Sequence, residues 1–340
     1  MEYPSINRSL LIGIILSIVF LSGWEWYCRE QGFVATMEDT KELWAETRAN
    51  LEDNNPNQLV SVSASRGHFD IQLNEWEALT GIRPLMLSAD GRGPGAVLED
   101  IVITTEFNGT ILLNVTPDMF FVPKADSLFA WWRGKEWVDY YNKRTYAQLF
   151  NHQVSYSLQP FFAFLTTGEE GDPDLKSMVR EWSNTNDRTK SGPPFPRFSY
   201  CDFERNTTML DKVVTDTAFA AIIQRAWMFD TDSVNRFVDH KQSIFNFYLK
   251  LIETFKARGG KVIITRNPSH GGVRSYEKDV YPRSEWWDEF IEQANCPAYH
   301  FEDYPQLDQF YTPEWSHLST PDARIYTTEL VKILQADGVL

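Results

Sequence analysis

Hydrophobic and β-branched residues gather in five short runs, and stretches with a helical repeat separate them. The runs are Leu59–Ala64, Pro84–Ser88, Ile111–Thr116, Lys261–Thr265 and Ala298–Phe301. The helical stretches are Asp70–Leu79, Gly95–Ile103, Ser243–Ala257, Trp286–Ala294 and Thr320–Leu334. Strands that alternate with helices favour a parallel sheet with helices on both faces. The pattern therefore predicts a three-layer α/β fold with a parallel sheet of about five strands.

A further apolar stretch lies near the N-terminus, where Leu10–Trp24 holds no charged residue. A helix of about 20 residues crosses the hydrocarbon layer of a membrane. Leu21–Gly23 offers only a poor match to a signal-peptide cleavage site, and the aromatic residues of Trp24–Tyr27 suit the headgroup level. We therefore predict an uncleaved transmembrane anchor over residues 1–30, and a cleaved signal peptide is the alternative. The charges that flank the segment favour an orientation with residues 31–340 outside the cytoplasm.

Residues 31–340 are expected to form one α/β domain. The segment from about 124 to 242 separates the third and fourth strand runs and contains amphipathic helical pieces and a loop-like stretch, Lys190–Pro196. We interpret it as a helical insertion, or cap, over the C-terminal edge of the sheet, where ligands of α/β proteins bind.

The amino-acid composition argues against several classes of function. Lys and Arg total 32 and Asp and Glu total 47, which gives a net charge of −15 and argues against nucleic-acid binding. The three cysteines, Cys28, Cys201 and Cys296, have none of the close spacings of a metal or redox site, so no metal and no cofactor are expected. A disulfide between Cys201 and Cys296 stays conceivable in an oxidising compartment.

Two segments could carry chemistry. The first strand run leads into Ser63–Gly67, where Ser65 could be a nucleophile at the strand end or simply a turn residue or helix cap. Ser61 and Ser63 alternate with valines along the strand and are weaker candidates. Near the C-terminus, Glu314 precedes His317 by three residues in the loop before the last helix. A carboxylate there can orient the imidazole so that it takes a proton from a serine, although the spacing also occurs by chance.

Together these segments resemble the SGNH (GDSL-like) hydrolase superfamily, in which a serine after the first strand is paired with a D-x-x-H motif before the last helix. The resemblance makes Ser65 the nucleophile and His317 the general base, with Glu314 in the place of the usual aspartate. Gly91 matches the glycine after the second strand that contributes to the oxyanion hole. The usual asparagine after the third strand has no clear counterpart, and Asn114 could serve in its place.

Arginine residues gather after the fourth strand run, in a region expected to be a loop that faces Ser65. They could bind a carboxylate or hydroxyl groups of a substrate, or pair with local acidic residues. The candidate substrate-binding residues are Arg66, Arg266, Asn267, Arg274 and Arg283.

The resemblance implies a membrane-anchored serine esterase or O-acyltransferase of a bacterial cell envelope, at the periplasmic or extracellular side of the inner membrane. The expected substrate is an acyl ester, with acetyl the favoured group, of an envelope glycan or exopolysaccharide. A membrane-bound O-acyltransferase is the expected partner. The alternative is a catalytically degenerate relative that binds a glycan or takes part in assembly.

Overall fold

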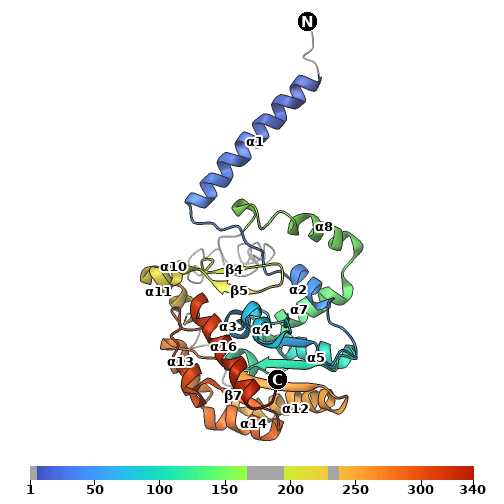
Figure 1. Cartoon of the computed structure of the whole chain (residues 1–340), viewed down its shortest axis with the longest axis vertical. Coiled ribbons are helices and arrows are strands. Elements are labelled where there is room, and N and C mark those ends of the chain that lie inside the picture. The colour runs from blue at the N-terminus through green and yellow to red at the C-terminus, as the bar shows by residue number, and fades with distance from the viewer. Residues whose placement is uncertain (1–5, 167–194, 229–236) are drawn as a thin grey trace.

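Five parallel strands form the central sheet of the computed structural model, which describes residues 6–166, 195–228 and 237–340 (Figure 1). In spatial order they are β2 (Leu85–Met86), β1 (Leu59–Val62), β3 (Thr110–Asn114), β6 (Lys261–Arg266) and β7 (Ala298–His300). Counted along the chain within the sheet, this is the doubly wound order 2-1-3-4-5. The predictions of an α/β class and of a five-stranded parallel sheet are confirmed.

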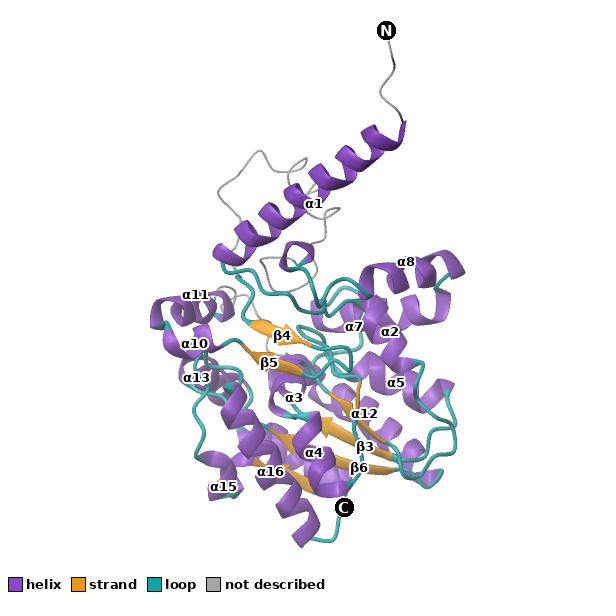
Figure 2. Ribbon diagram, turned by 45° about the horizontal axis from the view of Figure 1, so that its top comes forward, coloured by secondary structure: helices purple, strands orange, loops and turns teal. Residues whose placement is uncertain are grey.

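Successive side chains of each strand point to opposite faces of the sheet, so the hydrophobic core has two layers. Val60 and Val62 face one side, with the apolar residues of α5 (Gly95–Thr104) and α12 (Lys241–Ala257). Leu112 and Ile263 face the other, against α4 (Leu73–Thr80) and α16 (Thr320–Ala336). Each strand therefore supplies both layers. Figure 2 shows helices on both sides of the strands.

Helices and a small hairpin complete the fold. The helices of the body are α2 (Lys41–Arg48), α3 (Ser65–Asp70), α6 (Pro117–Phe120), α13 (Gly271–Val280), α14 (Glu289–Ala294) and α15 (Pro305–Asp308), with 3-10 turn η4 (Phe301–Asp303) and π-helical turn η3 (Ser284–Asp288). Within residues 124–242 lie α7 (Phe129–Lys143), α8 (Tyr146–Tyr156), η1 (Ala163–Leu165), β4 (Ser199–Cys201), β5 (Thr207–Met209), α10 (Asp211–Thr215), α11 (Thr217–Trp227) and η2 (Phe237–His240). The helix α7 packs on α2 and α5, whereas β5 packs on α3 at the strand ends. Most of the loop-like stretch Lys190–Pro196 lies outside the described residues.

Two local predictions were wrong, and a disulfide that the sequence left open is not formed. The helix expected over Asp70–Leu79 is interrupted, because the backbone N–H of Gln72 and the carbonyl of Asp70 both bond the Thr327 hydroxyl of α16. The region after β6, expected to be a loop, contains α13, whose buried face carries Glu277 and Val280. Cys201 and Cys296 are free thiols, so they form no disulfide.

The N-terminal helix α1 (Ile6–Glu30) projects from the body (Figure 1). Within the described residues it is the one helix that is long and apolar enough to cross a membrane. Its apolar side chains, for example Leu16 and Val19, are exposed rather than packed on the domain.

A buried carboxylate joins α13 to the strand ends. Glu277 pairs with Arg66 of α3 at 2.5 Å and with Arg266 of β6 at 2.5 Å, and it accepts a hydrogen bond from Ser269 at 2.6 Å. Burial acts to raise the pKa of Glu277, but the charges of Arg266 and Arg66 outweigh it and lower the pKa to about 2.

We expect Glu277→Gln to destabilise the fold by about 3–5 kcal/mol, because it leaves two buried arginines without a counter-charge. The pKa of Glu277 lies below the ordinary value of 4.5. Its stabilising effect is therefore complete above that pH and is lost as the pH falls towards about 2. Urea unfolding of the full chain in detergent micelles measures both effects. Glu285→Gln, at an exposed position, is the control, and equal midpoints for the two variants would contradict the assignment.

Candidate active site

The candidate residues of the first two strands follow β1 and β2, and the strand order reverses between β1 and β3. Ser65 begins α3 just after β1, which lies between β2 and β3. Gly91 follows β2 with a φ of +62°, a conformation that favours glycine. The backbone N–H of Ala89 donates to the Ser63 carbonyl at 3.0 Å and so holds these two strand exits together. In doubly wound sheets, ligands bind at this switch point.

Glu314 orients His317. One carboxylate oxygen, Oε1, accepts the backbone N–H groups of Ser316 at 3.2 Å and His317 at 2.5 Å, and it lies 3.1 Å from Nδ1 of His317. Trp315 between them has a φ of +80°, which turns the loop back on the carboxylate. An ionised carboxylate can only accept, so the nitrogen that donates to Glu314 is Nδ1.

The free nitrogen of His317 is buried without a partner. Within the described residues Nε2 makes no hydrogen bond, although nearly all buried polar atoms make one. The imidazole stacks on Phe69 with ring centroids 4.3 Å apart, and Phe198 lies on it at 5.8 Å. Trp227 donates its indole N–H to Oε2 of Glu314. Aromatic side chains thus pack around the His317 imidazole, and its Nε2 has no hydrogen-bond partner among the described residues.

Hydrogen bonds tie the helix that begins with Ser65 to the loop that carries His317. Arg66 Nε donates to Ser316 Oγ at 3.3 Å, and the backbone N–H of Leu318 donates to Asp70 Oδ1 at 3.0 Å. The structure therefore places Ser65 and His317 at the same edge of the sheet. Ser65 is partly exposed, and within the described residues its hydroxyl makes no hydrogen bond to His317.

The other strand serines are already satisfied. Ser63 Oγ donates to the Ala64 carbonyl at 2.6 Å and lies 2.8 Å from Ser88 Oγ, while Ser61 Oγ lies 3.1 Å from the same hydroxyl. These bonds suit structural roles for Ser61 and Ser63.

Asn114 ends β3 but is turned into the protein. Its amide nitrogen donates to Thr265 Oγ1 at 3.1 Å and to Asn267 Oδ1 at 2.7 Å, so both amide hydrogens are used. Asn267 in turn bonds Asp70 and the hydroxyl of Tyr326. In this arrangement Asn114 supports the strand ends and offers no amide hydrogen to an oxyanion.

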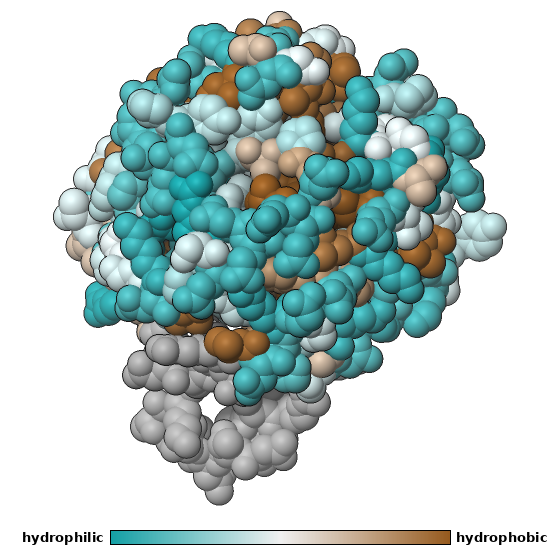
Figure 3. Space-filling view, turned by 90° about the horizontal axis from the view of Figure 1, so that it is seen from below, coloured by the Kyte–Doolittle hydropathy of each residue, from teal (hydrophilic) through white to brown (hydrophobic). Residues whose placement is uncertain are grey.

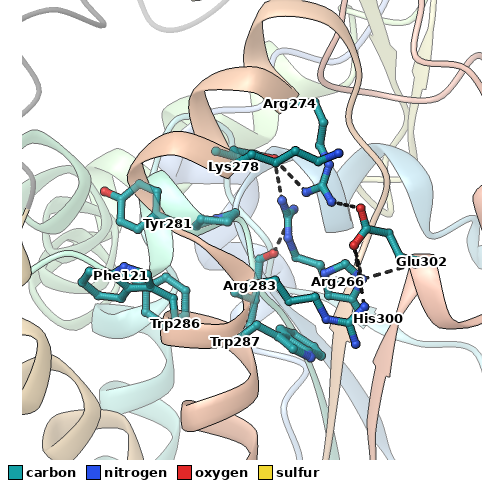
Figure 4. Close-up of a pocket in the computed structure, with 13 residues that line it drawn as sticks. Phe121, Arg266, Arg274, Lys278, Tyr281, Arg283, Trp286, Trp287, His300 and Glu302 are labelled. Carbon is teal, nitrogen blue, oxygen red and sulfur yellow. Dashed lines mark hydrogen bonds and ion pairs between the residues drawn. The ribbon is translucent and has the colours of Figure 1, made fainter.

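Three of the candidate substrate-binding arginines line a cavity of about 80 Å³ at the ends of β3, β6 and β7 (Figure 4). Arg266 pairs with Glu277, Arg274 with Glu302, and Arg283 with Asp303 and Asp288. Local acidic residues thus balance these charges, as the alternative interpretation expected.

His300 lines the same cavity and is neutral. Burial, helped by the nearby arginines, lowers its pKa to about 2. The other two candidates, Arg66 and Asn267, are buried in bonds to Glu277 and to Asp70.

His68, which the sequence did not single out, anchors the turn before Gly91. Its Nδ1 lies 2.8 Å from Asp90 and its Nε2 lies 2.7 Å from the Arg205 carbonyl. Both partners are acceptors, so the imidazole is protonated, and Asp90 raises its pKa against the effect of burial. The side chains of Asp39, His68 and Cys201 lie close enough together to hold a metal ion. However, the Asp39 carboxylate already forms an ion pair with Arg205. The trio therefore fits an internal ion-pair network better than a metal site.

Comparison with known proteins gives one distant likeness. No protein-family model matches the chain, and no curated protein matches its sequence. A crystal structure of a proposed acylhydrolase from Bacteroides fragilis is similar with a TM-score of 0.40 at 10% sequence identity, over 88% of this chain and 99% of that one. At that level of similarity the case for function depends on the site itself.

Asp70 gives a test of the link between α3 and the His317 loop. Burial raises its pKa from 3.8 to about 7, so the folded chain binds this proton more tightly than the unfolded chain. The contribution of Asp70 to stability is therefore largest below about pH 4 and decreases as the pH rises to about 7. We expect Asp70→Asn to flatten this part of the profile, because an amide oxygen still accepts the Leu318 N–H. Urea midpoints from pH 4 to 8 measure it, and an unchanged slope, equal to that of exposed Asp279→Asn, would contradict the prediction.

Proposed function

We propose that the chain is a serine acyl-ester hydrolase or O-acyltransferase with Ser65 as nucleophile, His317 as general base and Glu314 as the residue that orients the base. The observation that carries the proposal is the buried His317 imidazole, whose Nδ1 is held by Glu314 while Nε2 has no partner. A protein does not usually bury such a nitrogen unused. Catalytic hydrogen bonds are often long in ligand-free sites and tighten with substrate.

The chemistry follows from these positions. Ser65 Oγ attacks the ester carbonyl while His317 Nε2 takes its proton, and the carbonyl oxygen becomes the oxyanion. The tetrahedral intermediate collapses to an acyl-serine, and His317 returns the proton to the leaving alcohol. Water or a glycan hydroxyl then attacks the acyl-serine by the same steps, which regenerates Ser65. The backbone N–H of Gly91 is the proposed oxyanion donor, since the amide of Asn114 is already used.

A more specific proposal concerns the location of the protein, its substrate and its partner. The exposed apolar α1 supports a membrane anchor. We propose from the flanking charges that residues 31–340 lie outside a bacterial cytoplasm. We further propose that the substrate is an O-acyl group, in particular acetyl, of an envelope glycan or exopolysaccharide, and that a membrane-bound O-acyltransferase is the partner. These expectations come from the resemblance of the Ser65, Gly91, Glu314 and His317 motifs.

A second candidate function is a non-catalytic glycan-binding or assembly component. The absence of a hydrogen bond between Ser65 and His317, together with the use of Asn114 in the interior, favours it. The two candidates differ in whether Ser65 reacts.

We expect a fluorophosphonate to label the full-length chain at Ser65, because this partly exposed hydroxyl follows β1 at the same edge of the sheet as the proposed base, His317. Labelling and hydrolysis of a chromogenic acetyl ester should disappear in Ser65→Ala and in His317→Ala, as measured by mass spectrometry and absorbance. Ser275→Ala, at an exposed serine of α13, is the matched control and should label like the natural chain. Equal labelling of the natural chain and Ser65→Ala would show that the nucleophile is wrong.

The proposed role of Glu314 predicts that its substitution reduces the rate of ester hydrolysis without abolishing it. Glu314→Gln keeps the shape but cannot stabilise a charged imidazole, and its amide nitrogen would face either His317 or the Trp227 N–H. We expect the rate to fall by about 10²–10⁴-fold, with the folded state retained by circular dichroism. An unchanged rate would mean that His317 does not act as a base oriented by Glu314.

A further inference from the structure

One stretch of the insertion lacks charge altogether. Thr145–Thr166 contains no Asp, Glu, Lys or Arg, although charged residues make up 23% of the chain. It comprises α8, a turn and η1. Surface segments of soluble domains normally carry charges, so this composition indicates a different environment.

Most of the large apolar side chains of this stretch are exposed. The helix α8 has no buried residue. Tyr146, Phe150 and Val154 are 91%, 73% and 53% exposed, and their spacing of four places them on one face of α8. Phe161 beyond the helix is 66% exposed. We call Tyr146, Phe150, Val154 and Phe161 the α8 surface.

The α8 surface is continuous with the end of the membrane helix. The carboxylate of Glu25 in α1 accepts the backbone N–H groups of Ala163 at 3.0 Å and Phe164 at 3.2 Å. Arg29 donates to the Phe161 carbonyl at 3.2 Å. In Figures 1 and 2, α8 lies on the side of the body from which α1 rises. By contrast, hydrophilic residues cover most of the opposite end (Figure 3).

We propose that the α8 surface lies in the headgroup region of the bilayer that α1 crosses, as a second membrane contact. Aromatic side chains favour this region, and Trp24 and Trp26 are exposed at the same end of α1. Two contacts would fix the tilt of the domain and the height of the Ser65 site above the lipid. The inference rests on the anchor of the proposed function but not on its chemistry.

The test uses the full chain in vesicles of phosphatidylethanolamine and phosphatidylglycerol. The three free cysteines are replaced by alanine, and an environment-sensitive fluorophore is attached at Val19→Cys, Val154→Cys or Ile325→Cys. Val19 lies in α1, Val154 lies in the α8 surface, and Ile325 of α16 is the matched control, since its 49% exposure is close to the 53% of Val154. Lipids with a spin label near the headgroup or deep in the acyl chain report the depth of each probe. If the cysteine-free chain does not fold, a genetically encoded fluorescent residue at the same positions gives the same readout.

We expect the shallow label to quench Val154 several-fold more strongly than Ile325, and the deep label to quench Val19. Quenching at Val19 with water-like emission at both Val154 and Ile325 would overturn the inference and leave the α8 surface to a protein partner or a second copy. Water-like emission at Val19 would reject the anchor, and the membrane contact with it. Neither result would bear on the reaction of Ser65 with fluorophosphonate, so the failures are distinguishable.

Discussion

The candidate site depends on one buried carboxylate, that of Asp70 at the end of α3. It accepts the backbone N–H of Leu318 and the side-chain amide of Asn267, so it joins the helix of Ser65 to the loop of His317 and to the end of β6. Burying a carboxylate costs free energy, and the raised pKa of Asp70 reports that cost. The carboxyl group adds to the Arg66–Ser316 hydrogen bond, so two polar contacts hold together the segments that carry the candidate nucleophile and base.

The need of buried polar groups for hydrogen-bond partners also explains why the Asn114 side chain points into the domain. Parallel strands end at one edge of the sheet, where backbone groups and polar side chains leave the apolar layers together, and each must find a partner. Asn267 satisfies Asp70, Asn114 and the Tyr326 hydroxyl at once. An asparagine at the end of β3 is therefore used inside the domain, so the proposed reaction would need backbone N–H groups, such as that of Gly91, to stabilise an oxyanion.

The sequence predicted the sheet well because strands buried on both faces are short, nearly continuous apolar runs, and helical stretches separate them. It also predicted the pairing of Glu314 with His317, since the two lie only three positions apart in the sequence. It failed where tertiary bonds decide the outcome: Thr327 interrupts the helix after Asp70, and α13 begins at Gly271–Gly272, which is a poor helix signal. No local pattern could indicate that Trp227 bonds Glu314, because the two are 87 residues apart.

The insertion between β3 and β6 contacts both α1 and the surroundings of His317. The turn after α8 and η1 bond the end of α1, and the later part of the insertion supplies Phe198 and Trp227, whose rings lie beside His317. Trp227 also fixes the carboxylate that orients the base. A sheet with the bare doubly wound topology would have neither contact. The same stretch of chain thus contacts α1 and also completes the surroundings of the candidate base.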